Sequence, residues 1–303
     1  MLLKTSDFKT IKKHLSKIYI PAKDSHKGKN GKVLIIGGSN LFHAASIWSA
    51  ETASHIVDIV HYSSTLENNQ IVLSLKEKFL NGIVVRKQYL IHYIQEDDCV
   101  LIGPGMIRCD KKILKKDLMF KDITYLEEEG DYTRFLTRYL IENYPEKKFV
   151  FDAGALQMMD PEWLLKLKTK PILTPHLIEF DNLFGVKLRS DSKNKEKTVL
   201  RIAKKYNCVI LLKSVDDIIS DGKRAYTIKG GNAGLAKGGS GDVLAGLSCS
   251  FYAKNNVLLS ALTSSILLKI TAEKLFLTKG YWYNISDIID KFHEILKSLR
   301  LYK

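Results

Sequence analysis

Short apolar runs recur along the chain of 303 residues, and more polar segments separate them. Runs of about four to eight apolar residues, bounded by glycine or polar side chains, are typical of strands buried on both faces of a parallel sheet. Helical segments lie between the runs, so we predict an α/β fold, a three-layer sandwich with a mainly parallel central sheet. The runs occupy residues 33–36, 56–62, 83–85, 98–102, 148–151, 171–173 and 209–212.

The intervening segments predict helices at residues 42–55, 132–143 and 192–206. Residues 257–277 form a long apolar stretch, but two lysines and a glutamate interrupt it, whereas a membrane-spanning helix needs about 20 nearly uncharged residues. We therefore predict a buried helix there and no membrane association. Residues 217–220 and 225–228 predict a hairpin with Asp221 and Gly222 at its turn.

The chain shows no linker or internal repeat that would mark a second domain. We expect an N-terminal lead-in at residues 1–24, containing a helix, and one domain at residues 25–303. The cysteines at 99, 109, 208 and 249 form no Cys-x-x-Cys pair, and we see no signal peptide. Free thiols in a reducing compartment are the simplest reading, which predicts a cytoplasmic protein.

The formal net charge is +14, and lysine rather than arginine supplies most of it, with 39 lysines and eight arginines. Proteins that read nucleic-acid sequence rely on arginine for bidentate base contacts, so we expect no nucleic-acid partner. A positive field should still attract anionic nucleotides.

The strongest chemical signal is the stretch 230–246, in which seven of seventeen residues are glycine. Gly238-Gly239-Ser240-Gly241 leads into Asp242, where a helix is predicted to begin. Free backbone N–H groups and the positive end of a helix dipole make such a site suitable for phosphate. Asp242 then has two readings: a helix N-cap, or a base that accepts a hydroxyl proton while the amides hold a phosphoryl group. The stretch is neither a Walker loop, a dinucleotide fingerprint nor a Gly-x-Ser-x-Gly elbow.

This glycine loop resembles the anion hole of the ribokinase-like superfamily. The wider string from Gly231 to Leu244 is similar to the ADP/ATP-dependent NAD(P)H-hydrate dehydratases. Gly-Gly-Ser at 37–39, Gly-Pro-Gly at 103–105 and Thr-Pro-His at 174–176 follow the same family pattern. The resemblance implies a ribokinase-like fold, with Asp242 as catalytic base. It implies substrate-binding roles for Ala45, Gly105, His176 and Asp242, and nucleotide-binding roles for Lys213, Ser214, Val215, Asp216, Asp217, Gly238, Gly239, Ser240 and Gly241.

Three positions depart from the family pattern: Ala44, Leu177-Ile178 and Ser214. Asp152, at the end of a predicted strand, has two open readings, one as a loop-shaping residue and one acting through Mg²⁺ and water. No motif identifies metal ligands, although Mg²⁺ is expected with the nucleotide.

The resemblance implies ADP- or ATP-dependent dehydration of NADHX or NADPHX, the hydrated nicotinamide cofactors, by a homo-oligomeric enzyme. Phosphorylation of the ring hydroxyl would create a good leaving group, and loss of phosphate would restore the reduced ring. A small-molecule kinase of the same superfamily, acting on a vitamin precursor or sugar, is the alternative enzyme. A non-catalytic nucleotide-binding protein is the alternative from another class.

Overall fold

In the computed structural model, which describes residues 1–75, 81–110, 117–188 and 192–298, the strands form one ten-stranded sheet. Its order is β1-β10-β9-β8-β7-β6-β5-β2-β3-β4. Every neighbouring pair is parallel except those that include β9, so the predicted mainly parallel sheet is confirmed. The strands are β1 (Leu2–Lys4), β2 (Lys32–Ile36), β3 (Ile59–Ser63), β4 (Gly82–Val84), β5 (Cys99–Ile102), β6 (Lys148–Phe151), β7 (Ile172–Leu173), β8 (Val209–Leu212), β9 (Asp217–Ser220) and β10 (Ala225–Lys229).

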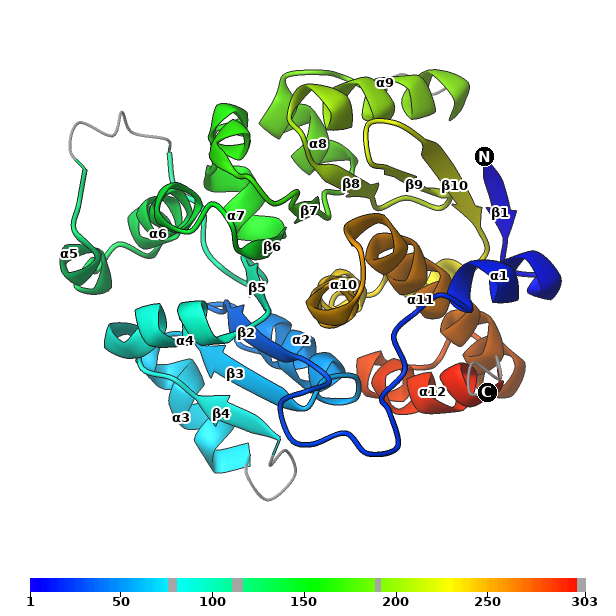
Figure 1. Ribbon diagram of the computed structural model, residues 1–303, viewed down its shortest axis with the longest axis horizontal. Coiled ribbons are helices and arrows are strands. Elements are labelled where there is room, and N and C mark those ends of the chain that lie inside the picture. Colours follow the sequence, from blue (N-terminus) through cyan, green and yellow to red (C-terminus); the bar gives the residue numbers. More distant parts are fainter. Residues whose placement is uncertain (76–80, 111–116, 189–191, 299–303) are drawn as a thin grey trace.

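Helices cover both faces of the sheet, as the continuous apolar strands require (Figure 1). One face packs against α1 (Phe8–Leu15), α2 (Ala44–Ser54), α10 (Ser240–Lys254), α11 (Val257–Lys279) and α12 (Ile285–Ser298). The other packs against α4 (Leu90–Glu96), α5 (Phe120–Thr124), α6 (Glu129–Asn143), α7 (Ala153–Met158), α8 (Leu177–Phe184) and α9 (Ser192–Lys205). Helix α3 (Leu66–Ser74) and the 3₁₀ turns η2 (Lys87–Tyr89), η3 (Pro161–Lys166) and η4 (Ala233–Ala236) complete the described elements.

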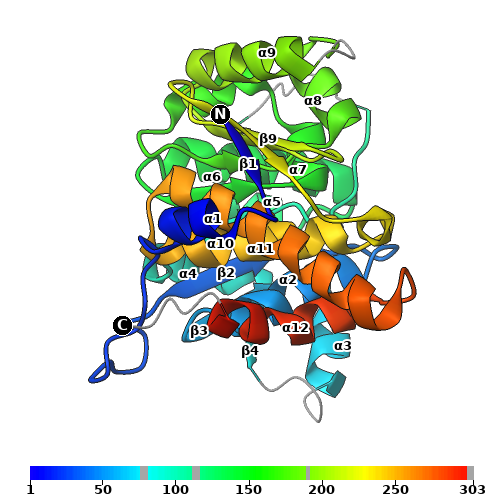
Figure 2. The same cartoon turned by 90° about the vertical axis from the view of Figure 1, so that its right-hand side faces the viewer.

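The N-terminal segment contains the expected helix and also a strand that the hydrophobic pattern did not indicate. Strand β1 pairs in parallel with β10 at one edge of the sheet (Figure 2). Helix α1 follows, and Ile11 and Leu15 are fully buried in the core. Residues 2–15 therefore contribute to the same sheet and core as the rest of the chain, while the division at residue 24 stays a prediction.

The hairpin and the long buried helix are confirmed. Strands β9 and β10 pair antiparallel around Asp221 and Gly222. Helix α11 is buried along most of its length, and none of the helices in the described ranges combines the length and hydrophobicity that crossing a bilayer requires. Helix α10 packs against β2, β5 and β6, and Lys213, the residue after β8, reaches Gly241 in its first turn, so strand-end residues lie beside the glycine loop.

Candidate active site

Asp242 lies in the first turn of α10, directly after the glycine loop. The N-cap of this helix is Gly239, so the reading of Asp242 as the N-cap is wrong. Gly239 has a φ of 103°, and a Cβ there would lie 2.6 Å from the ring of Trp48 and 2.7 Å from Ile285. Only glycine fits this position, so no side chain can serve as the N-cap of α10.

The environment of Asp242 suits a base that works near neutral pH. Burial and, to a smaller extent, the negative charge of Asp152 raise the pKa of Asp242, Lys213 opposes them, and the net pKa is about 7. A general base is most effective when its pKa lies close to the working pH. The pKa of Asp242 therefore agrees with the catalytic reading of the sequence.

Lys213, at the end of β8, is held between carboxylates from two other strand-end loops. Its Nζ lies 2.8 Å from Oδ1 of Asp152 and 3.8 Å from Oε2 of Glu179. Burial alone would lower the pKa of Lys213, but the charges of Asp152 and Glu179 raise it overall. A Cβ on Gly241 would lie 3.4 Å from this Nζ. Lys213 is thus a fixed positive charge beside the first turn of α10.

Asp152 is buried and has a second partner. Thr174 Oγ1 donates a hydrogen bond of 2.7 Å to Asp152 Oδ1, and the same oxygen accepts a hydrogen bond from Lys213 Nζ. The next residue, Ala153, has a φ of 40°, which is uncommon for a residue with a Cβ. Strained backbone of this kind is concentrated at functional sites. These contacts agree with the reading of Asp152 as a loop-shaping residue, and its second reading, through Mg²⁺ and water, stays a prediction.

A cavity of about 440 Å³ opens beside Lys213 and the start of α10. Six of the predicted nucleotide-binding residues line it, namely Lys213, Ser214, Val215, Asp217, Ser240 and Gly241. The other three do not: Gly238 and Gly239 lie in the turn before the helix, and Asp216 forms an ion pair of 3.5 Å with Lys229. Gly230, Gly231, Asn232, Ala233, Leu235, Ala236, Leu244, Leu268 and Lys269 complete the lining.

Lys269 is the residue of this cavity that the sequence analysis failed to assign. It is 3% exposed, and its Nζ donates hydrogen bonds of 2.7 Å to Val215 O and 3.5 Å to Gly230 O. The same Nζ lies 3.6 Å from Asp217 Oδ2. Lys269 therefore joins two backbone segments that line the cavity. A lysine within an apolar helix was the available signal, because a buried charge must be paired.

Two predicted substrate residues, Ala45 and Gly105, lie against each other. Gly105 has a φ of 71°, and a Cβ there would lie 3.0 Å from the Cβ of Ala45. Ser49 Oγ lies 3.2 Å from Ala45 O and 2.9 Å from Asp242 O. This hydroxyl connects α2 to α10, so the structure brings Ala45, Gly105 and Asp242 into one neighbourhood.

His176 caps α8 and remains half exposed. Its Nδ1 accepts hydrogen bonds from the backbone N–H groups of Ile178 and Glu179, while Glu179 Oε2 accepts one from the backbone N–H of His176. This reciprocal capping box begins the helix even though Leu177 and Ile178 replace the family's Pro-Gly. Because Nδ1 accepts, the neutral ring carries its proton on Nε2. The side chain is 48% exposed, and its Nε2 lies 3.5 Å from Oε1 of Glu179.

The chain is similar over nearly its whole length to proteins of one family. The family model described as NAD(P)H-hydrate dehydratase matches residues 33–294. The ADP-dependent (S)-NAD(P)H-hydrate dehydratase of Nitrosopumilus maritimus is 30% identical over 307 residues, covering 95% of this chain and 97% of that protein. The bifunctional NAD(P)H-hydrate repair enzyme Nnr of Methanocaldococcus jannaschii is 31% identical over 281 residues, covering 90% of this chain. This chain spans about half of that relative, 50% of its length.

A solved structure has the same fold. The ADP/ATP-dependent NAD(P)H-hydrate dehydratase of Bacillus subtilis, co-crystallised with ATP and Mg²⁺, superposes with a TM-score of 0.77 at 19% identity, covering 95% of this chain and 97% of the other. The likeness confirms the predicted ribokinase-like fold. With the family model and the relatives matching over most of the sequence, the chain belongs to the NAD(P)H-hydrate dehydratase family.

Proposed function

We propose that this protein converts hydrated NADH or NADPH back to the reduced cofactor in a reaction driven by ADP or ATP. The observation that carries the proposal is the position of Asp242. It lies in the first turn of α10, whose Ser240 and Gly241 line the cavity of about 440 Å³, and its backbone oxygen accepts a hydrogen bond from Ser49, whose hydroxyl also bonds Ala45 O. A nucleotide in the cavity and a hydrated nicotinamide ring over Ala45 and Gly105 would meet at this carboxylate.

The chemistry follows from these groups. The ring hydroxyl attacks the terminal phosphoryl group of the nucleotide, and Asp242 accepts the hydroxyl proton. The N–H groups at the start of α10 and the ammonium of Lys213 stabilise the charge on the transferred group, because positioning and electrostatics dominate phosphoryl transfer. The ring nitrogen's lone pair then expels phosphate as the carbon–oxygen bond breaks, and the adjacent ring carbon loses a proton to the departing phosphate or to water, which forms the carbon–carbon double bond of the dihydropyridine.

Mg²⁺ fits this site only together with the nucleotide. The described residues contain no group of three His, Cys, Asp or Glu side chains arranged to hold a metal ion. Mg²⁺ is usually held by one or two carboxylates and by substrate phosphates, and Asp152 and Asp242 are the carboxylates available here. When bound, the ion would neutralise charge on the phosphates.

The cytoplasmic location and the homo-oligomeric state of this protein stay predictions.

The deciding experiment follows the products. Purified enzyme is incubated with NADHX and with ADP or ATP in turn, and the reduced cofactor, inorganic phosphate and shortened nucleotide are quantified. The proposal predicts equal amounts of all three. Asp242→Asn is the matched control, since it is nearly isosteric but cannot accept the proton, and loss of a positioned base costs about 10²–10⁴ in rate.

A stable phosphorylated organic product with no free phosphate would instead identify a small-molecule kinase. Nucleotide binding without any turnover would identify the non-catalytic alternative. Full activity of Asp242→Asn would contradict the role of Asp242 as base. Family membership favours the dehydratase over both alternatives.

A further inference from the structure

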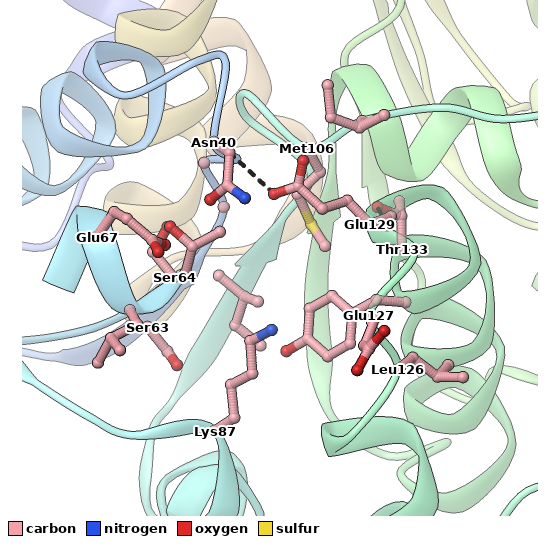
Figure 3. A pocket seen from close by; sticks show the side chains of 17 residues that line it. Asn40, Ser63, Ser64, Glu67, Lys87, Met106, Leu126, Glu127, Glu129 and Thr133 are labelled. Carbon is pink, nitrogen blue, oxygen red and sulfur yellow. Dashed lines mark hydrogen bonds between the residues drawn. The ribbon is translucent and has the colours of Figure 1, made fainter.

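A second cavity, of about 150 Å³, lies over the C-terminal ends of β2 and β3 and against α6 (Figure 3). It adjoins the proposed substrate residues. Gly38 and Met106 line it, and a Cβ on Gly105 would lie only 3.2 Å from Gly38 Cα. A long ligand that passes over Gly105 would therefore reach this cavity. Its lining is Ile36, Gly37, Gly38, Asn40, Ser63, Ser64, Thr65, Leu66, Glu67, Lys87, Met106, Ile107, Leu126, Glu127, Glu129, Tyr132 and Thr133.

Lys87 supplies a positive charge to this cavity, and it forms no ion pair with any of the described residues. Its Nζ lies 3.9 Å from the ring centroid of Tyr132, and no carboxylate in the described ranges lies within 4.0 Å of it. Burial lowers the pKa of Lys87, while the charges of Glu129 and Glu67 partly oppose that effect. An ammonium in this position is suited to an anion that arrives with the ligand, such as a phosphate.

Carboxylates surround the rest of the cavity. Glu67, Glu127 and Glu129 line it beside Lys87, which gives the lining a net formal charge of −2 from three acids and one lysine. Figure 3 shows these side chains directed toward a common space, with Glu129 accepting a 2.9 Å hydrogen bond from the backbone N–H of Asn40. Ionised carboxylates only accept hydrogen bonds, so they match the hydroxyl groups of a sugar.

We propose that this cavity binds the adenosine-side ribose of the hydrated dinucleotide, with Lys87 at the adjoining pyrophosphate, and thereby selects NADHX over NADPHX. The inference rests on the proposed function. In dinucleotide-binding folds a carboxylate commonly binds the ribose 2′-hydroxyl of NAD, whereas the 2′-phosphate of NADP needs a cation. A 2′-phosphate adds about −1.5 to −2 of charge near pH 7, and the lining already carries an excess of negative charge. The pyrophosphate is common to both substrates, so Lys87 strengthens binding without discriminating.

The test compares kcat/KM for NADHX and NADPHX at saturating nucleotide. Wild-type enzyme should prefer NADHX by about tenfold or more, since like charges in contact cost several kcal/mol. Glu127→Arg should narrow or reverse this preference. Glu127 is exposed, and its side chain makes no hydrogen bond to another residue of the described ranges, so the substitution should not disturb folding, and Glu127→Gln removes the charge alone. Glu128→Arg is the matched control, because it makes the same charge change one residue away and outside the lining.

A second arm tests Lys87. Lys87→Met should raise KM for both hydrated cofactors by about tenfold and leave KM for the nucleotide unchanged, because one charge-assisted contact to phosphate is lost. Equal kcat/KM for NADHX and NADPHX in the wild type, or a shift with Glu128→Arg as large as with Glu127→Arg, would overturn the specificity inference while the dehydratase activity stood. Failure to convert either hydrate with any nucleotide would refute the proposed function itself.

Discussion

Asp242→Asn should make the ligand-free protein more stable at neutral pH while it slows turnover by about 10²–10⁴-fold. The pKa of Asp242 rises in the folded state from 3.8 to about 7. Each unit is about 1.36 kcal/mol, so the folded protein carries an ionised Asp242 at a cost of about 4 kcal/mol. Partial access of solvent to this carboxylate reduces the cost, and we expect a gain of about 2–4 kcal/mol in the asparagine variant.

The sign of the pH dependence follows from proton uptake. Between pH 4 and 7 the unfolded chain has lost the Asp242 proton while the folded protein still holds it. The contribution of protonated Asp242 to the free energy of unfolding is therefore full below about pH 4. It is lost progressively as the pH rises to about 7. The difference in free energy of unfolding between Asp242→Asn and wild type should be near zero at pH 4 and largest above pH 7.

Urea denaturation of both proteins at several pH values from 4 to 8.5, without nucleotide, measures this difference directly. Turnover of NADHX by the same preparations links the result to catalysis. A constant difference across the pH range, or a less stable asparagine variant, would refute the reasoning that Asp242 is held at an energetic cost. A stabilised asparagine variant with full activity would show that the pKa of Asp242 is raised but that Asp242 is not the catalytic base.

Three further predictions concern other residues of the candidate active site. Asp152→Asn removes a charge that raises the pKa of Asp242, so the acid limb of the pH profile of kcat/KM should move from about pH 7 to lower pH; an unmoved limb would contradict the coupling. Lys269→Met should weaken ADP or ATP binding measured by calorimetry, whereas Arg134→Met, which removes another buried cation that lies outside the cavity lining and pairs with the 39% exposed Asp160, should not. His176→Ala should lower the free energy of unfolding by about 1 kcal/mol through the lost cap and raise KM for NADHX more than KM for nucleotide; equal changes in both KM values would make His176 structural only.

The sequence was most informative where strands end. Apolar runs followed by Gly-Gly-Ser, Gly-Pro-Gly or Thr-Pro-His predicted the strands and the sheet edge where the candidate site lies, because parallel strands bring their C-terminal ends together. It was less informative about partners distant in the chain. Nothing near Lys213 in the sequence indicates that Asp152 would bind it, since that contact depends on the order of β6 and β8 in the sheet.

Other features could not be predicted because they depend on packing. The segment Leu2–Lys4 is too short for its hydrophobic pattern to predict a strand. It is a strand because its backbone pairs with β10. The second cavity is lined by residues from Ile36 to Thr133, which the fold gathers from several loops and α6. The family motif assigned Asp216, Gly238 and Gly239 to nucleotide binding, but these residues do not line the cavity. Whether a residue faces the cavity depends on the path of its loop, which the motif does not specify.

The pairing of β1 with β10 has a consequence for how the protein is made. Leu2, Leu3 and Lys4 find their partners at Thr227, Ile228 and Lys229, more than two hundred residues later. During synthesis the first strand must wait until most of the chain has left the ribosome, and until then its apolar side chains have no sheet to join. Pairings of such long sequence separation form slowly and leave intermediates exposed to aggregation. Completion of this sheet edge is therefore expected to be a late step, after β8, β9 and β10 have assembled.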